Sequence, residues 1–79
     1  MDLRGKKVLV IGAGKSGVAV SRFLSGKGAA VVLADANHPD DSRGEWEQLS
    51  TEGVQIFLGG YPKVERGSFD LVVISPGVP

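Results

Sequence analysis

The chain has no cysteine and only one histidine, and both scarcities exclude kinds of chemistry. Without cysteine there is no disulfide framework, no thiolate metal site and no cysteine nucleophile, so packing must supply the stability. His38 stands in a polar stretch without other metal ligands, and the adjacent Asp40 and Asp41 are typical of solvated loop acids. We therefore expect no metal site and no catalytic residue in this chain.

Net charge and long apolar runs are also missing. Nine basic residues balance nine acidic ones, so no overall field attracts a nucleic acid or a membrane surface. The polar first seven residues lack the apolar core of a signal peptide, and no apolar run approaches the length of a membrane span. From these absences we expect a cytoplasmic monomer that binds neither nucleic acid nor membrane.

What the 79 residues do contain is four short apolar runs, separated by helical or turn-forming segments. The runs are residues 7–11, 30–34, 54–58 and 71–74. Their unbroken, largely β-branched character is typical of strands that are buried in a parallel sheet. Because parallel strands need right-handed crossovers, we predict a Rossmann-like α/β fold. Its expected form is a three-layer α/β/α sandwich of about four strands in the order 3-2-1-4, truncated before the final helix and strand.

Two helices are predicted between these strands, over residues 16–27 and, more weakly, over residues 45–51. The residues expected on their inner faces are Gly17, Ala19, Val20, Phe23, Leu24, Trp46 and Leu49. Ser16 is the expected N-cap, and Gly26 or Gly28 is expected to end the first helix. We interpret Trp46 as a core residue rather than as a ring that stacks on a ligand.

The first strand is followed at once by Gly-Ala-Gly-Lys-Ser-Gly, a G-x-G-x-x-G pattern that opens a helix. Gly12 permits a tight turn, Gly14 lets a phosphate approach the backbone, and Gly17 lets the helix pack closely on the strand. The first amides of the helix then face an anion, so a phosphate or pyrophosphate is the expected ligand. A Walker A loop is excluded, because Leu9 stands where that pattern needs a glycine.

Two charged residues near the turn leave alternatives open. Lys15 lies at its mouth, where it either neutralises a pyrophosphate or is simply solvated. Asp35 ends the second strand, eighteen residues after Gly17, where dinucleotide-binding proteins place a carboxylate for a ribose. That spacing fits NAD, yet the same carboxylate would also accept the N3–H of uracil while the amides of Ala36 and Asn37 donate to its O4. An unengaged Asp35 on a ligand-free scaffold is the remaining alternative.

Four stretches carry a resemblance that covers essentially the whole chain. They are the strand and turn of residues 7–17, the acid Asp35, the Gly-Gly pair at residues 59–60, and the ending Phe-Asp-Leu-Val-Val-Ile-Ser-Pro-Gly-Val-Pro of residues 69–79. Together they resemble the Mur ligase family, specifically the N-terminal domain of its UDP-N-acetylmuramoyl-L-alanine:D-glutamate ligase branch. The ending is the most telling stretch, since ordinary dehydrogenase domains do not usually carry it.

The resemblance implies the N-terminal fragment of a longer, ATP-dependent ligase of bacterial peptidoglycan synthesis, an enzyme of cell-wall biogenesis, cell shape and cell division. This single domain would hold the UDP part of UDP-N-acetylmuramoyl-L-alanine and would need no cofactor of its own. ATP, Mg²⁺ and D-glutamate would be handled by central and C-terminal domains outside these residues. By this resemblance the fragment alone binds weakly and does not catalyse.

The UDP-binding residues that the resemblance implies are Gly12, Gly14, Lys15, Ser16, Gly17, Asp35, Ala36, Asn37, Ser75, Pro76 and Gly77. The turn would contact the pyrophosphate, Asp35 and Ala36 the uracil, and residues 75–77 the other wall. A typical family member has a hydroxyl residue and an arginine after the acid, whereas this chain has Ala36 and Asn37. Either fewer uridine contacts are expected there, or Lys15 compensates for them. An NAD(H)-binding regulatory or dehydrogenase domain is the alternative, because pyrophosphate is common to both ligands.

Overall fold

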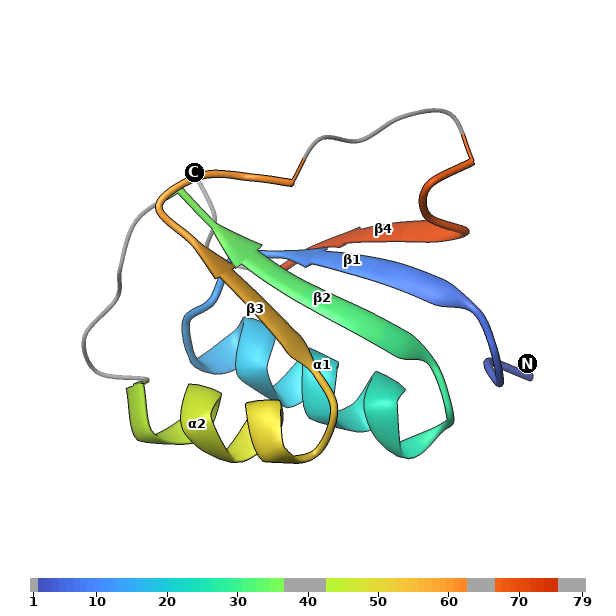
Figure 1. Cartoon of the computed structure of the whole chain (residues 1–79), viewed down its shortest axis with the longest axis horizontal. Coiled ribbons are helices and arrows are strands. Elements are labelled where there is room, and N and C mark those ends of the chain that lie inside the picture. Colours follow the sequence, from blue (N-terminus) through green and yellow to red (C-terminus); the bar gives the residue numbers. More distant parts are fainter. Residues whose placement is uncertain (1, 37–42, 63–66, 76–79) are drawn as a thin grey trace.

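The computed structural model describes residues 2–36, 43–62 and 67–75 (Figure 1). Its elements are β1 (Lys7–Ile11), α1 (Lys15–Gly26), β2 (Ala30–Asp35), α2 (Arg43–Thr51), β3 (Gln55–Leu58) and β4 (Leu71–Ile74). The bounds of β1 and β4 are those predicted, and the other elements differ from their predicted bounds by one or two residues. Both strands are delimited by apolar runs that end sharply, although only β1 is buried as expected and β4 is mostly exposed in the described part of the chain.

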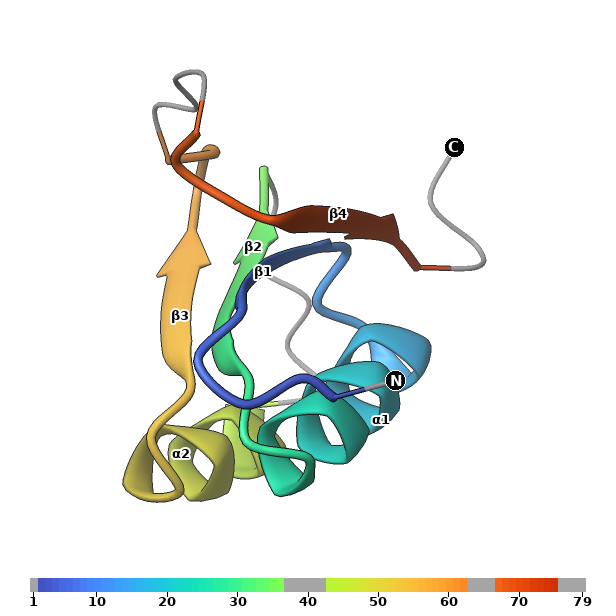
Figure 2. The same cartoon turned by 90° about the vertical axis from the view of Figure 1, so that its right-hand side faces the viewer.

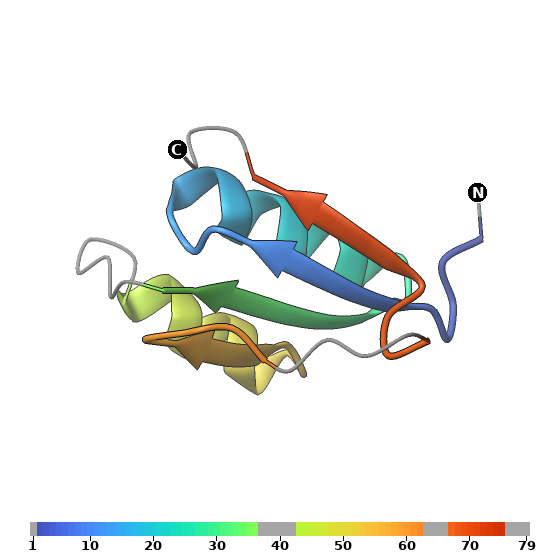
Figure 3. The same ribbon diagram turned by 90° about the horizontal axis from the view of Figure 1, so that it is seen from above.

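The four strands form one parallel sheet in the order β3-β2-β1-β4, which confirms the predicted topology. β1 lies inside the sheet, with Val10 paired to Leu33 of β2 on one side and to Val73 of β4 on the other. Figure 3 shows the four arrowheads pointing the same way. All the strand carboxyl ends therefore meet at one edge of the sheet.

Both helices cover the same face of this sheet (Figure 2). α1 packs on β1 and β2, α2 packs on β3, and the two helices contact each other. The described part of the chain thus forms two layers, a sheet and one layer of helices, and not the three layers predicted. The third layer is missing there because the described residues between β3 and β4 form turns rather than a helix. On the other face, the apolar side chains of Val72 and Ile74 are exposed.

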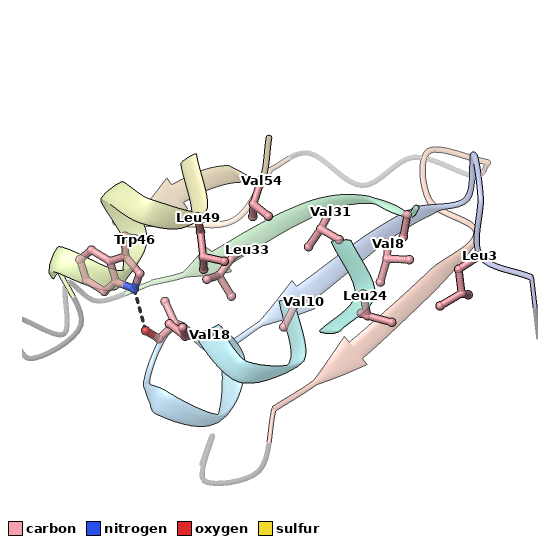
Figure 4. Close-up of a cluster of buried hydrophobic side chains, with 12 residues drawn as sticks. Leu3, Val8, Val10, Val18, Leu24, Val31, Leu33, Trp46, Leu49 and Val54 are labelled. Carbon is pink, nitrogen blue, oxygen red and sulfur yellow. Dashed lines mark hydrogen bonds between the residues drawn. The ribbon is translucent and has the colours of Figure 1, made fainter. Parts of the chain in front are cut away.

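The core lies between the helices and the sheet (Figure 4). Its buried residues include Val8, Val10, Val18, Leu24, Val31, Leu33, Trp46 and Leu49. The predicted inner face of α1 was wrong at Ala19 and Phe23, which are exposed, whereas Val18 and Ser21 are buried in their place. The cause is the close contact of Gly17 with the turn before it, which fixes the rotation of the helix so that positions four and seven residues later also face inward.

The predicted cap of α1 was also wrong. Gly14 is the N-cap, the helix begins at Lys15, and no side chain caps its first turn, so Ser16 already belongs to the helix. At the other end the helix stops at Gly26, and Gly28 takes a φ of +92°, which favours glycine. None of the helices in the described ranges is both long and apolar enough to cross a bilayer.

Candidate functional site

Three of the predicted ligand-binding segments come together at the edge where the strands end. The Gly12 N–H donates to the Ala34 carbonyl at 2.8 Å, which joins the turn after β1 to the end of β2. The Ser75 N–H donates to the Ile11 carbonyl at 2.9 Å, which brings the residue after β4 to the same place. In open parallel sheets ligands bind at this edge, between strands whose connections leave in opposite directions. Three predicted site residues, Asn37, Pro76 and Gly77, lie outside the described residues.

The glycine turn has the shape that its motif predicts. Gly12 has a φ of +107°, a conformation that side chains disfavour. A Cβ on Gly17 would overlap the Gly12 carbonyl oxygen and lie 2.8 Å from the carbonyl carbon, so the helix touches the turn there. The structural roles predicted for Gly12 and Gly17 are thus confirmed. A Cβ on Gly14, in contrast, would meet nothing within 4 Å, so the space beside this residue is open.

The start of α1 beside this open space carries positive charge. The backbone of Gly14 is extended, and its carbonyl accepts the Val18 N–H at 3.0 Å. The first turn contains no acidic residue and no side-chain cap, and the exposed Lys15 adds an ammonium group. Helix N-termini attract anions through their unpaired amides and dipole, so this end of α1 is suited to a phosphate.

Asp35 is tied to the turn, which the sequence did not reveal. Its Oδ2 atom accepts the Ala13 N–H at 2.8 Å, and its main-chain carbonyl accepts the Gly59 N–H at 2.9 Å. The half-buried side chain thus holds the turn after β1, while the backbone holds the chain after β3. Lys15, Ser16 and Ala36 are exposed. Their contacts with a ligand stay predictions, and so does the contact of Asp35 with a nucleotide.

Trp46 reaches the same alanine from α2. Its indole Nε1–H donates to the Ala13 carbonyl at 2.9 Å, the dashed line in Figure 4. With 7% of its surface exposed, Trp46 is a core residue, as predicted. The hydrogen bond was missed, although one signal existed: a buried indole N–H nearly always has an acceptor, and turn carbonyls are common ones.

A family model and curated relatives agree on one family. The model of the Mur ligase MurD-like N-terminal domain matches residues 6–79. A UDP-N-acetylmuramoylalanine--D-glutamate ligase of Pelotomaculum thermopropionicum is 65% identical over 78 residues, which are 99% of this chain and 17% of that relative. The ligase of the same name from Koribacter versatilis is 43% identical over 79 residues, again 17% of its length. The chain thus spans about a sixth of the length of these relatives.

Solved structures are similar in fold at low identity. The flavoprotein disulfide reductase RclA of Escherichia coli matches 95% of this chain with 22% of its own, at a TM-score of 0.72 and 19% identity. In a covalent putidaredoxin reductase–putidaredoxin complex, 24% of one chain matches 92% of this one, at a TM-score of 0.73 and 21% identity. These similarities support the Rossmann-like fold alone.

Proposed function

The chain belongs to the Mur ligase family as a MurD-like N-terminal domain, and on this premise we propose that it binds the UDP part of UDP-N-acetylmuramoyl-L-alanine. The whole protein would be an ATP-dependent, D-glutamate-adding ligase of peptidoglycan synthesis in the cytoplasm. The single observation that carries the proposal is the uncapped start of α1, which lies beside open space at the edge where Asp35 and Ser75 also lie.

The diphosphate is proposed to lie against the turn and the first residues of α1. The open space beside Gly14 allows an anion to approach the backbone, and the amides of Gly14, Lys15 and Ser16 would donate to its oxygens. The ammonium group of Lys15 would add a flexible positive charge, which suits a ligand carrying two phosphates. No acidic residue of the first helical turn opposes this charge.

The uracil is proposed to lie beyond the end of β2. Uracil offers one donor, N3–H, between two carbonyl acceptors, and a carboxylate followed by a main-chain amide complements this edge. Asp35 and Ala36 provide that pair at the site, with Ala36 exposed. Ser75, which is hydrogen-bonded to Ile11 next to the turn, would contribute to the opposite wall.

The chemistry is proposed to take place outside these residues. ATP, Mg²⁺ and D-glutamate would bind to other domains of the ligase. There is room for such domains, because each relative is about six times as long as this chain. The 79 residues would then act as a substrate-holding domain, monomeric and without activity of their own.

A two-dimensional amide NMR titration tests the proposal. UDP-N-acetylmuramoyl-L-alanine should shift the amides of residues 14–17, Asp35, Ala36 and Ser75 to saturation, while UMP, which lacks the second phosphate, should bind more weakly. Saturation with NADH and not with the UDP ligand would overturn the proposal in favour of a dinucleotide-binding domain. Absence of shifts at millimolar concentrations of either ligand would show that the chain does not bind nucleotide by itself.

A further inference from the structure

Both polar backbone groups of Ala13, its N–H and its carbonyl, are hydrogen-bonded to side chains from outside the turn. Ala13 is fully buried, its N–H donates to Asp35 at 2.8 Å, and its carbonyl accepts the Trp46 indole N–H at 2.9 Å. The N–H belongs to the peptide unit between Gly12 and Ala13, and the carbonyl to the unit between Ala13 and Gly14. Each of two successive peptide units is therefore fixed by one hydrogen bond.

The second of these units determines where the Gly14 amide points. The peptide bond is planar and trans, so the Gly14 N–H is directed opposite to the Ala13 carbonyl. Since that carbonyl points at Trp46, the Gly14 N–H points away from α2. The indole of Trp46 thus sets the direction of an amide at the very residue that is open to a ligand.

The turn needs such an external restraint because of its own composition. Glycines stand on both sides of Ala13, and glycine leaves a peptide unit free to rotate through conformations that other residues disfavour. A hydrogen bond in a nearly water-free environment is strong and directional, and Trp46 is almost completely buried. One buried bond is therefore well placed to select a single orientation of the Ala13–Gly14 peptide unit.

We propose that Trp46 is a positioning residue of the anion site: it touches no ligand itself but holds the Gly14 amide in the direction that a phosphate oxygen requires. This inference rests on the proposed function of the turn. The conformational entropy of the Gly14 amide is already lost when the protein folds. Binding of a diphosphate is then stronger, because it does not have to order this amide. Loss of the indole N–H is expected to weaken UDP binding about fivefold, the effect of one neutral hydrogen bond.

The variant Trp46→Phe removes the donor and keeps an aromatic ring in the core. Leu49→Val is the matched control, because Leu49 is fully buried on the same helix and its side chain is in the same core. The first measurement needs no ligand: it is the ¹⁵N relaxation of the Gly14 amide. We expect greater motion of this amide in Trp46→Phe and wild-type motion in Leu49→Val. The loss of thermal stability of both variants, followed by circular dichroism, should be comparable.

The second measurement is the Kd for UDP, from the same amide spectra. An increase of about fivefold in Trp46→Phe, with a control within twofold of wild type, is the expected result. An unchanged Gly14 amide in Trp46→Phe would overturn the positioning role. If the wild-type chain does not bind UDP, the proposed function fails, whereas the ligand-free measurement still decides whether Trp46 orders the turn.

If Trp46→Phe does not fold, replacement of the indole by benzothiophene provides the same test. This ring has nearly the shape of indole and carries sulfur in place of the N–H group, so packing is kept and only the donor is lost. Wild-type ¹⁵N relaxation of the Gly14 amide in this variant would overturn the proposal.

Discussion

At both ends of β1 an aspartate side chain accepts a main-chain N–H. The two bonds differ in the segment that each of them orders. At the amino end, Asp70 Oδ2 accepts the Lys7 N–H at 2.8 Å, and the Asp70 N–H donates to the Lys7 carbonyl at 2.8 Å. At the carboxyl end, Asp35 Oδ2 accepts the Ala13 N–H, also at 2.8 Å. At each end of β1 an aspartate thus accepts a main-chain N–H: Asp70 directly precedes β4, and Asp35 ends β2.

At the amino end the two bonds join only two residues, whereas at the carboxyl end the aspartate bond is one of several that hold the glycine turn. Asp70 and Lys7 exchange two bonds with each other, which locks the register of β4 on β1. Asp35 instead holds a glycine turn that is also bound by Trp46 and leads into the uncapped α1. The bond of Asp70 is exposed and that of Asp35 is half-buried, and they also differ in the segment that they order. A side-chain bond from an aspartate to the main chain therefore does not mark a binding site by itself; the segment that it orders does.

The largest difference between the two ends is expected when a methyl group is added to a glycine. Gly17→Ala at the carboxyl end forces a Cβ into the Gly12 carbonyl, and should lower the free energy of unfolding by roughly 3 kcal/mol or more. Gly28→Ala at the amino end places a Cβ 2.7 Å from the Cγ atom of Arg4 and 3.3 Å from its Cα atom, at a φ of +92°, and should cost about 1–2 kcal/mol. Urea unfolding followed by Trp46 fluorescence measures both.

Gly14→Ala is the control for this pair, because its Cβ would meet nothing and its φ of −77° suits any residue. It should leave stability within about 1 kcal/mol of wild type and yet weaken UDP binding, since the methyl group would occupy the ligand space. Equal losses of stability at positions 14 and 17 would show that the turn is not packed as described.

An intermediate effect is expected for the two aspartates. Asp35→Ala and Asp70→Ala each remove the acceptor of one main-chain N–H. Asp35→Ala should lower the free energy of unfolding by about 1–2 kcal/mol, and Asp70→Ala by about 0.5–1 kcal/mol, because water can replace the acceptor of the exposed Lys7 N–H. Only Asp35→Ala should also weaken UDP binding, at temperatures where both variants are folded. A similar loss of UDP affinity in Asp70→Ala would remove the distinction between the two ends.

The asparagine variants separate the two roles of Asp35. Asparagine keeps one carbonyl oxygen, which is enough for the Ala13 N–H but does not also serve a uracil N3–H. Asp35→Asn should therefore regain most of the stability lost in Asp35→Ala and little of the UDP affinity. Full recovery of the affinity would restrict Asp35 to holding the turn.

The smallest effect is expected for the lysines. Lys15→Gln should raise the Kd for UDP about two- to fivefold and reduce its dependence on salt, because an exposed charge contributes little in water. Lys7→Gln, an exposed lysine at the amino end of β1, should leave the Kd unchanged. Isothermal titrations at two salt concentrations check both, and equal effects at the two positions would point to general attraction rather than to a site.

The fold was predictable from the sequence where each residue acts locally. The strands were recognisable because runs such as 7–11 and 71–74 are apolar without interruption, and the crossover rule then restricted their order. The rotation of α1 was not predictable, because it follows from the contact of Gly17 with Gly12 rather than from hydrophobicity. Phe23 is 62% exposed although it is among the most apolar residues of that helix.

The site was predictable in its outline and not in its connections. The glycine spacing identified the turn, because each glycine answers a steric need at a known place. The bonds from Asp35 and Trp46 to Ala13 span 22 and 33 residues, and no local pattern in the sequence encodes such contacts. The burial of Ser21, whose hydroxyl has no hydrogen-bond partner among the described residues, was equally hidden.

The bond between Lys7 and Asp70 also has a consequence for the order of assembly. It joins residues 63 apart, whereas α1 and β2 follow β1 directly along the chain. Closing a long loop costs more chain entropy than closing a short one, and long-range parallel pairing is slow. Of these four strands, β1 is therefore the first to be synthesised, and it gains its second neighbour only when β4 follows. Until Asp70 arrives, one edge of the nascent sheet stays open to other chains.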